Sequence, residues 1–168
     1  IQNYDYYVSE NGNTYIAYTD AQSGDNVDGS MNLIGSNGAG WVNLGSIPLP
    51  AVRKLIVNFF EPYQIRIIRN GDNPFIVLFR ENNTIAVFKF DGVALQLLAD
   101  DVPYPFNPTQ SFTVTTKTDL CVHNNKLTTF GFGNSLGLLN DPHSVYQLNG
   151  SAFTVYKTVG AGNITLRG

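Results

Sequence analysis

The sequence predicts an all-β protein made of three repeated four-stranded antiparallel meanders. Helical signals are nearly absent, because no helical hydrophobic period continues for three turns. Short runs of β-branched and aromatic residues instead alternate with turn dipeptides, which supply the positive φ angles that tight hairpins need. Dipeptides of this kind, each with a β-prone run on both sides, stand at Asn11-Gly12, Asn37-Gly38, Asn70-Gly71, Asp91-Gly92 and Asn149-Gly150.

Three of these turns recur at a nearly constant spacing, which indicates an internal repeat. Gly38, Gly92 and Gly150 follow one another roughly every 55 residues, and self-similarity at a fixed spacing is the sequence signature of repeat architectures. Each turn is expected to join the third strand of a unit to its fourth. The expected strands are residues 4–8, 15–18, 31–34 and 41–45 in the first unit, 64–69, 75–80, 84–90 and 94–98 in the second, and 119–123, 127–132, 144–148 and 153–159 in the third.

The units divide one all-β repeat domain, residues 1–168, into segments of about 1–50, 51–103 and 104–160. A chain of this length buries enough surface to fold without a disulfide or a metal. Extra β-prone runs precede the second and third units, at residues 54–60 and 111–116. Residues 161–168 are expected to supply a closing strand beside the first unit, because such closure removes an exposed sheet edge.

The composition favours an extracellular or surface-associated protein. Only 14 % of the residues are charged and the net charge is −3, so amides and hydroxyls cover most of the polar surface. The basic residues are scattered, which argues against nucleic acid as a partner. No apolar run is long enough to insert into a membrane as a helix. The one cysteine, Cys121, lies in an apolar run and is expected to be buried and inert.

Two segments of the first unit carry a distinctive pattern. They read Asn-Gly-Asn-Thr-Tyr-Ile-Ala-Tyr-Thr-Asp at residues 11–20 and Asn-Gly-Ala-Gly-Trp-Val-Asn-Leu-Gly at residues 37–45. This pattern resembles the blades of extracellular β-propellers, which carry an Asn-Gly turn, a Tyr-rich strand, and a second Asn-Gly turn followed by Trp and a Val-Gly ending. The other two units share the layout and the second turn but lack the Trp. The resemblance implies a β-propeller-like architecture and leaves the function open, because propellers host many functions.

The chain departs from that family in two respects, so several architectures stay open. Units of roughly 55 residues exceed the usual blade, and three blades do not close a ring. The chain is therefore part of a larger ring, or copies of it assemble to complete one, or the fold is another threefold β architecture. A β-trefoil or a β-prism fits the same length, and both families are rich in sugar-binding proteins.

Residues that could carry acid–base catalysis are few, so no catalytic residue is predicted and the chain is not expected to be an enzyme. The glutamates Glu10, Glu61 and Glu81 border turns or Pro, and His123 and His143 are the only histidines. Catalysis of this kind needs paired carboxylates or a poised His. The expected function is a non-catalytic structural, assembly or adhesion module. The alternatives are a lectin-like carbohydrate-binding protein and a glycoside hydrolase-like domain.

One loop, residues 20–30, carries the residues that a cation would need. Asp20, Asp25 and Asp28 could supply oxygen ligands to Ca²⁺. Their spacing does not match an EF-hand, and a soluble loop with Asx turns explains the same residues. No other cofactor is expected.

Two aromatic residues are the candidates for ligand binding. Trp41 occupies the repeat-motif position, where it either packs within the repeat or stacks on a ligand. Tyr104 lies between Pro103 and Pro105, which hold it on a stiff segment.

The outer strand of each unit is expected to be open to a partner. Residues 41–45, 94–98 and 153–159 contain no Pro and only one Lys, Lys157, whereas natural sheet edges are usually guarded by such residues. We therefore expect self-association or completion by a longer parent chain, with glycans as a further possible ligand.

Overall fold

The computed structural model describes residues 3–20, 27–53, 65–79, 84–103, 120–131 and 143–160, and within these ranges every regular element is a β-strand. The described part of the chain has no helix that is long and apolar enough to span a membrane. The strands form three four-stranded antiparallel sheets, as the sequence predicts. The sheets consist of β1 (Asn3–Val8), β2 (Thr14–Thr19), β3 (Val27–Ser36) and β4 (Trp41–Arg53); β5 (Ile65–Ile68), β6 (Phe75–Phe79), β7 (Thr84–Phe90) and β8 (Leu95–Pro103); and β9 (Leu120–His123), β10 (Lys126–Gly131), β11 (His143–Asn149) and β12 (Ala152–Gly160).

Each sheet is a simple meander whose third and fourth strands are joined by one of the three repeated turns. Gly38, Gly92 and Gly150 have φ angles of 90°, 94° and 60°, a region that glycine adopts without strain. The Asp91 carboxylate also fixes its turn, because Oδ1 accepts hydrogen bonds of 2.8 Å from the amides of Val93 and Ala94. The prediction that these turns mark three equivalent units is confirmed.

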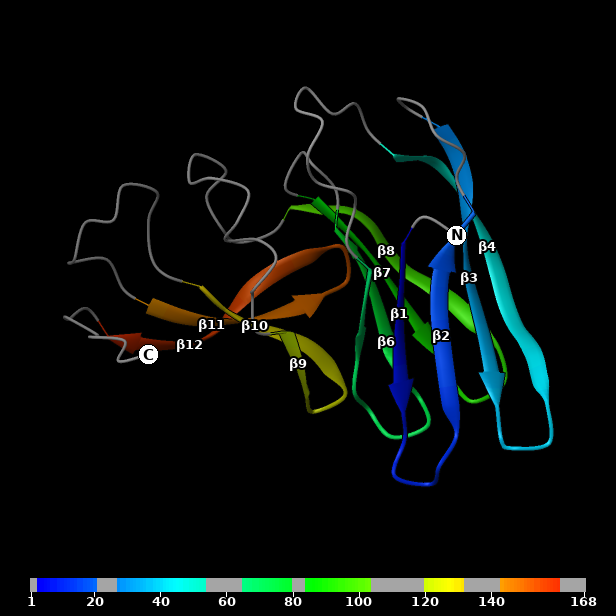
Figure 1. Ribbon diagram of the computed structural model, residues 1–168. Helices are drawn as coiled ribbons and strands as arrows, with labels where there is room; N and C mark the ends of the chain where they lie inside the picture. Colours follow the sequence, from blue (N-terminus) through cyan, green and yellow to red (C-terminus); the bar gives the residue numbers. More distant parts are fainter. Residues whose placement is uncertain are drawn as a thin grey trace.

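The three sheets follow one another in the same sense (Figure 1). The first strands β1, β5 and β9 are neighbours, and so are the fourth strands β4, β8 and β12. The first hairpin turns also lie at one end of the molecule, because Asn11 bonds to Asp72 and Asn70 bonds to Asn125. Equivalent strands are therefore adjacent, and each sheet turns the same kind of face toward the next one.

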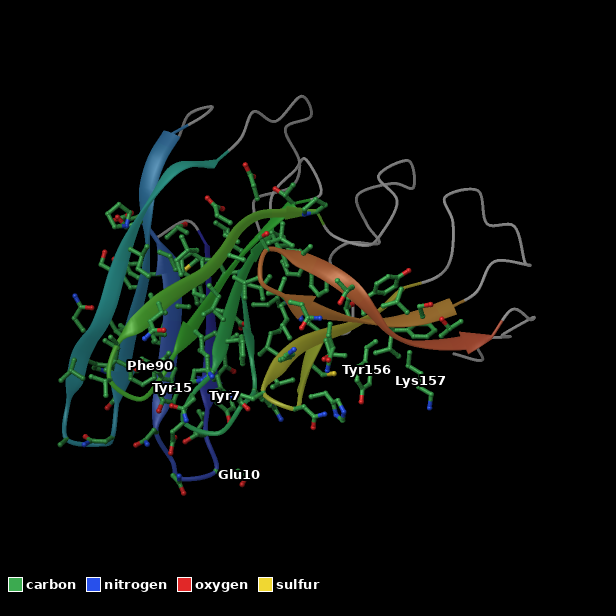
Figure 2. The ribbon with its side chains drawn as sticks, turned by 180° about the vertical axis from the view of Figure 1, so that it is seen from behind. Tyr7, Glu10, Tyr15, Phe90, Tyr156 and Lys157 are labelled. Atoms are coloured by element: carbon green, nitrogen blue, oxygen red, sulfur yellow. The ribbon has the colours of Figure 1, made fainter. Side chains whose placement is uncertain are left out.

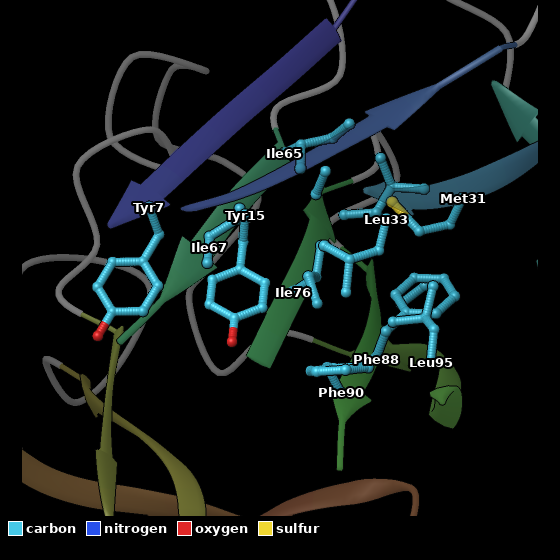
Figure 3. Packing of buried hydrophobic residues seen from close by; sticks show 13 residues of the cluster. Tyr7, Tyr15, Met31, Leu33, Ile65, Ile67, Ile76, Phe88, Phe90 and Leu95 are labelled. Carbon is cyan, nitrogen blue, oxygen red and sulfur yellow. The ribbon is translucent and has the colours of Figure 1, made fainter. Parts of the chain in front are cut away.

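Two separate hydrophobic cores hold the sheets together, and the second sheet contributes to both. Between the first and second sheets, Met31 and Leu33 pack with Ile76 and Phe88 (Figure 3). Between the second and third sheets, a second cluster is formed by Ile68, Phe75, Val77, Ile85, Val87, Ala99, Val102, Leu127 and Leu148. Because strand side chains alternate between faces, the continuous apolar runs of β6 and β7 fit a sheet that is buried on both sides.

The outer strands are better guarded than the sequence analysis expected. β4 continues to Arg53 and includes Pro48 and Pro50, and β8 continues to Pro103 and includes Asp100 and Asp101. Proline and charge discourage pairing with a further strand. The expectation that these edges lack Pro was wrong for β4 and β8, because both strands run several residues past the segments that the sequence marks.

The exposure of Cys121 is a second correction. The thiol is exposed, although the sequence places it between Leu120 and Val122. In β9 the side chains alternate, so Leu120 and Val122 pack toward the second sheet while Cys121 lies on the opposite face. Residues 54–60, 111–116 and 161–168, which the sequence marks as extra or closing strands, lie outside the described residues.

Candidate functional site: the free face of the first sheet

The first sheet has one buried face and one face that no other described element covers. Along β2, burial alternates, with Tyr15, Ala17 and Thr19 turned toward the second sheet. On β1, Tyr7 is buried, whereas Tyr4 and Tyr6 are both 66 % exposed. The apolar and aromatic residues of β1 therefore divide between the core and the outside.

Strand register places a continuous set of side chains on the outer surface, which we call the free face. Residues directly opposite each other in antiparallel strands share a face, so the pairings extend the set from β1 to β4. The free face comprises Tyr4, Tyr6, Val8, Thr14, Ile16, Tyr18, Asn32, Ile34, Ser36, Trp41, Asn43 and Ser46.

The free face is aromatic and carries no charged side chain. Trp41 is 55 % exposed and Val8 is 54 % exposed, so both present apolar area to solvent together with the two outer tyrosines. Asn43 and Ser46 are exposed on β4, the strand that carries Trp41, and supply amide and hydroxyl groups. Exposed Tyr and Trp surrounded by neutral polar groups are typical of interaction surfaces rather than of a surface that only meets water.

The equivalent face of the second sheet shows what such a surface does within this chain. Because the sheets repeat in the same sense, the free face corresponds to the face of the second sheet that packs against the first. That face carries Ile65, Ile67, Ile76, Leu78 and Phe88, all buried. The free face holds the equivalent position but carries Tyr, Trp, Asn and Ser beside Val8, Ile16 and Ile34.

Of the two predicted ligand-binding residues, the structure describes only Trp41. Trp41 lies on the free face, opposite Ser36, so it does not pack inside the described part of the chain. Tyr104 lies outside the described residues. Sequence reasoning missed Tyr4 and Tyr6, although their alternation with Asp5 and Tyr7 was a signal that β1 has two usable faces.

The three predicted metal ligands are not brought together by the described residues. The Asp20 carboxylate accepts a 2.6 Å hydrogen bond from the Ser30 amide, which ties the two ends of this loop. Asp25 lies outside the described residues, and Asp28 is placed only as a residue of β3. The described residues contain no group of three or more His, Cys, Asp or Glu that could hold a metal ion. The calcium site stays a prediction.

A second polar cluster lies where the first hairpin turns of the first two sheets meet. The Asp72 carboxylate accepts hydrogen bonds from the Asn11 amide at 2.6 Å, the Asn13 amide at 3.1 Å and the Tyr15 hydroxyl at 3.2 Å. The Arg69 guanidinium lies 6.0 Å from the centre of the Tyr7 ring beside them. These contacts join β1 and β2 to the turn between β5 and β6, so the cluster fastens one sheet to the next.

Protonation in this cluster follows from the same contacts. The hydroxyl of Ser9 and the amides of Asn11 and Asn13 lower the pKa of Asp72 to about 2, because their donor dipoles favour the ionised carboxylate. Burial, followed by the charge of Asp72, raises the pKa of Tyr15 to about 12. Over the physiological range Asp72 is therefore an ionised acceptor and Tyr15 a neutral donor, which is the pairing that a structural contact needs.

We expect the Asp72→Asn variant to lose about 1 kcal/mol of stability at neutral pH, because a charged acceptor of several hydrogen bonds is removed. The folded-state pKa of Asp72 is lowered from 3.8, so its contribution is complete above that value and is lost as the pH falls toward about 2. Denaturant unfolding at a series of pH values should show a shallower loss of stability below pH 3.8 in the variant.

The control for this experiment is Asp100→Asn, which removes the same charge from the exposed part of β8, away from the turns. If Asp72→Asn and the wild-type chain lose stability in parallel over this acid range, then Asp72 does not fasten the two sheets.

Comparisons with protein family models, with curated proteins and with solved structures found no match to this chain. The class of protein is therefore defined by the fold itself: an all-β protein with repeated sheet units, built from three open four-stranded antiparallel sheets.

Proposed function

We propose that this chain is a non-catalytic structural, assembly or adhesion module of an extracellular or surface-associated protein, and that it binds its partner through the free face. The observation that carries this proposal is the uncharged free face, with exposed Tyr4 and Tyr6 on β1 at one edge and exposed Trp41 on β4 at the other. Such residues supply large contact area and a polar group at their outer end, which suits a partner that is bound from water.

We further propose that the three sheets are blades of a β-propeller-like arrangement. Two features support this reading over the β-trefoil and the β-prism. The sheets succeed one another in the same sense, with like strands adjacent. Each neighbouring pair of sheets also has a hydrophobic core of its own, rather than one core shared by all three.

Carbohydrate binding is the second candidate function, and it uses the same surface. Sugar rings present an apolar face on which Tyr or Trp can stack, together with hydroxyls that amides can bind. Trp41 has the neutral polar side chains of Ser36 and Asn43 nearby on the free face. This composition suits a neutral glycan better than a charged one.

The experiment uses the single tryptophan of the chain. Quenching of Trp41 fluorescence by acrylamide is measured over a protein dilution series and with added soluble neutral polysaccharide. We expect quenching to fall when the free face is occupied, because the indole becomes shielded from solvent. A Trp41 that stays fully quenchable under all these conditions would contradict the proposal.

A further inference from the structure

The stack of sheets ends in two unlike surfaces. One is the free face of the first sheet. The other is the surface of the third sheet that points away from the second sheet, which we call the far face. Register places on it the side chains of Cys121, His123, Lys126, Thr128, Phe130, Val145, Gln147, Thr154 and Lys157. Of these, Thr128 and Gln147 are buried. Because the sheets stack in one sense, the far face corresponds to the face with which each earlier sheet contacts its successor.

The far face is mostly polar, with Phe130 and Val145 as its apolar residues. Its cations are Lys126 and Lys157, and its described residues include no Asp or Glu. The Tyr156 ring contacts His123, with 5.6 Å between ring centres and 3.4 Å between the hydroxyl and Nε2. Tyr156 is itself 51 % exposed. The far face therefore offers cations and hydroxyls beside Phe130 and Val145, where the corresponding faces of the first two sheets are mostly apolar and buried.

The two end surfaces are chemically complementary. The free face presents uncharged aromatic rings, and cations bind such rings favourably. The chain already uses this contact between sheets, since the Arg69 guanidinium of the second sheet lies over the Tyr7 ring of the first. The far face, with its cations and no acidic residue, meets no like charge on the free face.

The first hairpin turns supply an independent argument. At each contact between neighbouring sheets, a polar side chain of the later turn is bound by the earlier sheet. Asp72 is held by Asn11 and Asn13, and Asn125 is held by Asn70 and by Lys89, the latter at 3.0 Å. If a first sheet followed the third sheet in the same way, its turn with Glu10 would approach Lys126 of the third sheet. Opposite charges would then meet at that contact.

Figure 2 shows the separation of these groups within one chain, with Glu10 at the turn between β1 and β2 and with Tyr156 and Lys157 on β12 of the third sheet. The contact must therefore be made between two copies. Pairing through the outer strands β4 and β8 is disfavoured by Pro48, Pro50 and the acidic residues of β8.

We propose that the free face of one copy of this chain docks onto the far face of a second copy, and that the second copy returns the same contact. This inference rests on the proposed function, because it names the partner of the free face. Contacts between unlike surfaces close into rings when the rotation permits. Two copies contribute six four-stranded sheets, which lies within the range of blade numbers at which such rings close.

The test compares one blocked variant for each surface by sedimentation. Tyr6→Lys blocks the free face, and Tyr156→Lys blocks the far face; both side chains are exposed in the single copy. Each variant alone should associate at least about tenfold more weakly than the wild-type chain. Tyr6→Lys sets a cation against Lys126 and Lys157 of the far face, and Tyr156→Lys removes the exposed ring of the far face and adds a charge that must be desolvated. Val93→Lys is the control, since Val93 is 86 % exposed and lies in a turn away from both surfaces.

The decisive sample is an equimolar mixture of the two variants. The mixture should form dimers more tightly than either variant alone, because Tyr156→Lys retains an intact free face and Tyr6→Lys retains an intact far face. One unblocked contact is thus restored. Val8→Lys and Thr154→Lys repeat the test on the same two surfaces, and circular dichroism confirms that each variant is folded.

Three outcomes would overturn the inference. If the wild-type chain is a monomer at every concentration, copies do not dock. If Tyr156→Lys dimerises as well as the wild-type chain while Tyr6→Lys does not, two free faces meet each other instead. If both variants dimerise normally, neither surface is used. Shielding of Trp41 by polysaccharide in a chain that stays monomeric would remove this inference and leave the proposed function standing.

Discussion

Phe88→Ala should lower the free energy of unfolding by about 3–5 kcal/mol, the usual cost of deleting a fully buried aromatic side chain. Phe88 lies on β7 of the central sheet, is 0 % exposed, and packs in the cluster that joins the first and second sheets. Met31 and Leu33 of the first sheet share this cluster. The substitution leaves a cavity between the two sheets. The hydrogen bonds within each sheet limit how far the strands can move to fill it.

Urea unfolding of the wild-type chain and of Phe88→Ala, analysed at equal m-values, measures the difference in the free energy of unfolding. Val93→Ala provides the control, because Val93 is 86 % exposed and surface changes usually stay within about 0.5 kcal/mol. Phe88→Leu offers a milder change if the alanine variant does not fold. A loss below about 1 kcal/mol for Phe88→Ala would mean that the first sheet does not pack on the second as described.

Gly45→Ala is expected to be nearly as damaging, for a different reason. Gly45 has a φ of 155°, and a Cβ at this position would lie 2.6 Å from Leu95 Cβ and 3.2 Å from the Leu95 amide nitrogen. These atoms belong to the start of β8, so they cannot move aside as a flexible side chain could. The bare backbone of Gly45 is what allows β4 to approach the second sheet.

Gly40→Ala is a matched control for this substitution. Gly40 has a similar φ of 145°, but a Cβ there would meet nothing within 4 Å. Both variants lose stability because alanine disfavours the positive φ angle. Only Gly45→Ala adds the steric clash, which costs about 1–3 kcal/mol in overpacked cores. Equal thermal stability of the two variants would contradict the close approach of β4 to β8.

The local elements of this fold could be predicted from the sequence because its turns are explicit. Asn37-Gly38, Asp91-Gly92 and Asn149-Gly150 each require positive φ, and each joins the third strand of a sheet to the fourth. The ends of β4 and β8 were missed, because Pro48 and Asp100 read locally as strand breakers. Their strands continue since an outer strand needs hydrogen-bond partners on one side only.

The candidate site could be predicted only in part. Trp41 stood out by its residue type, but Tyr4 and Tyr6 did not, because β1 carries aromatic residues on both faces and the sequence does not say which face is covered. The Asp72 cluster was missed for a related reason. Asn11 and Asp72 are far apart in the chain, and each looks like an ordinary turn residue until the sheets stack.

The exposure of Trp41 tests the central claim most directly, namely that the free face of the first sheet is the binding surface of this protein. Acrylamide quenching and the emission wavelength of Trp41 are recorded as the protein is concentrated and as neutral polysaccharide is added. We predict strong quenching and long-wavelength emission in dilute protein alone, then weaker quenching and a shift to shorter wavelength when the face is occupied. Tyr6→Lys should suppress the change, and Val93→Lys should preserve it. Emission and quenching that stay constant throughout, or that respond equally in both variants, would contradict the claim.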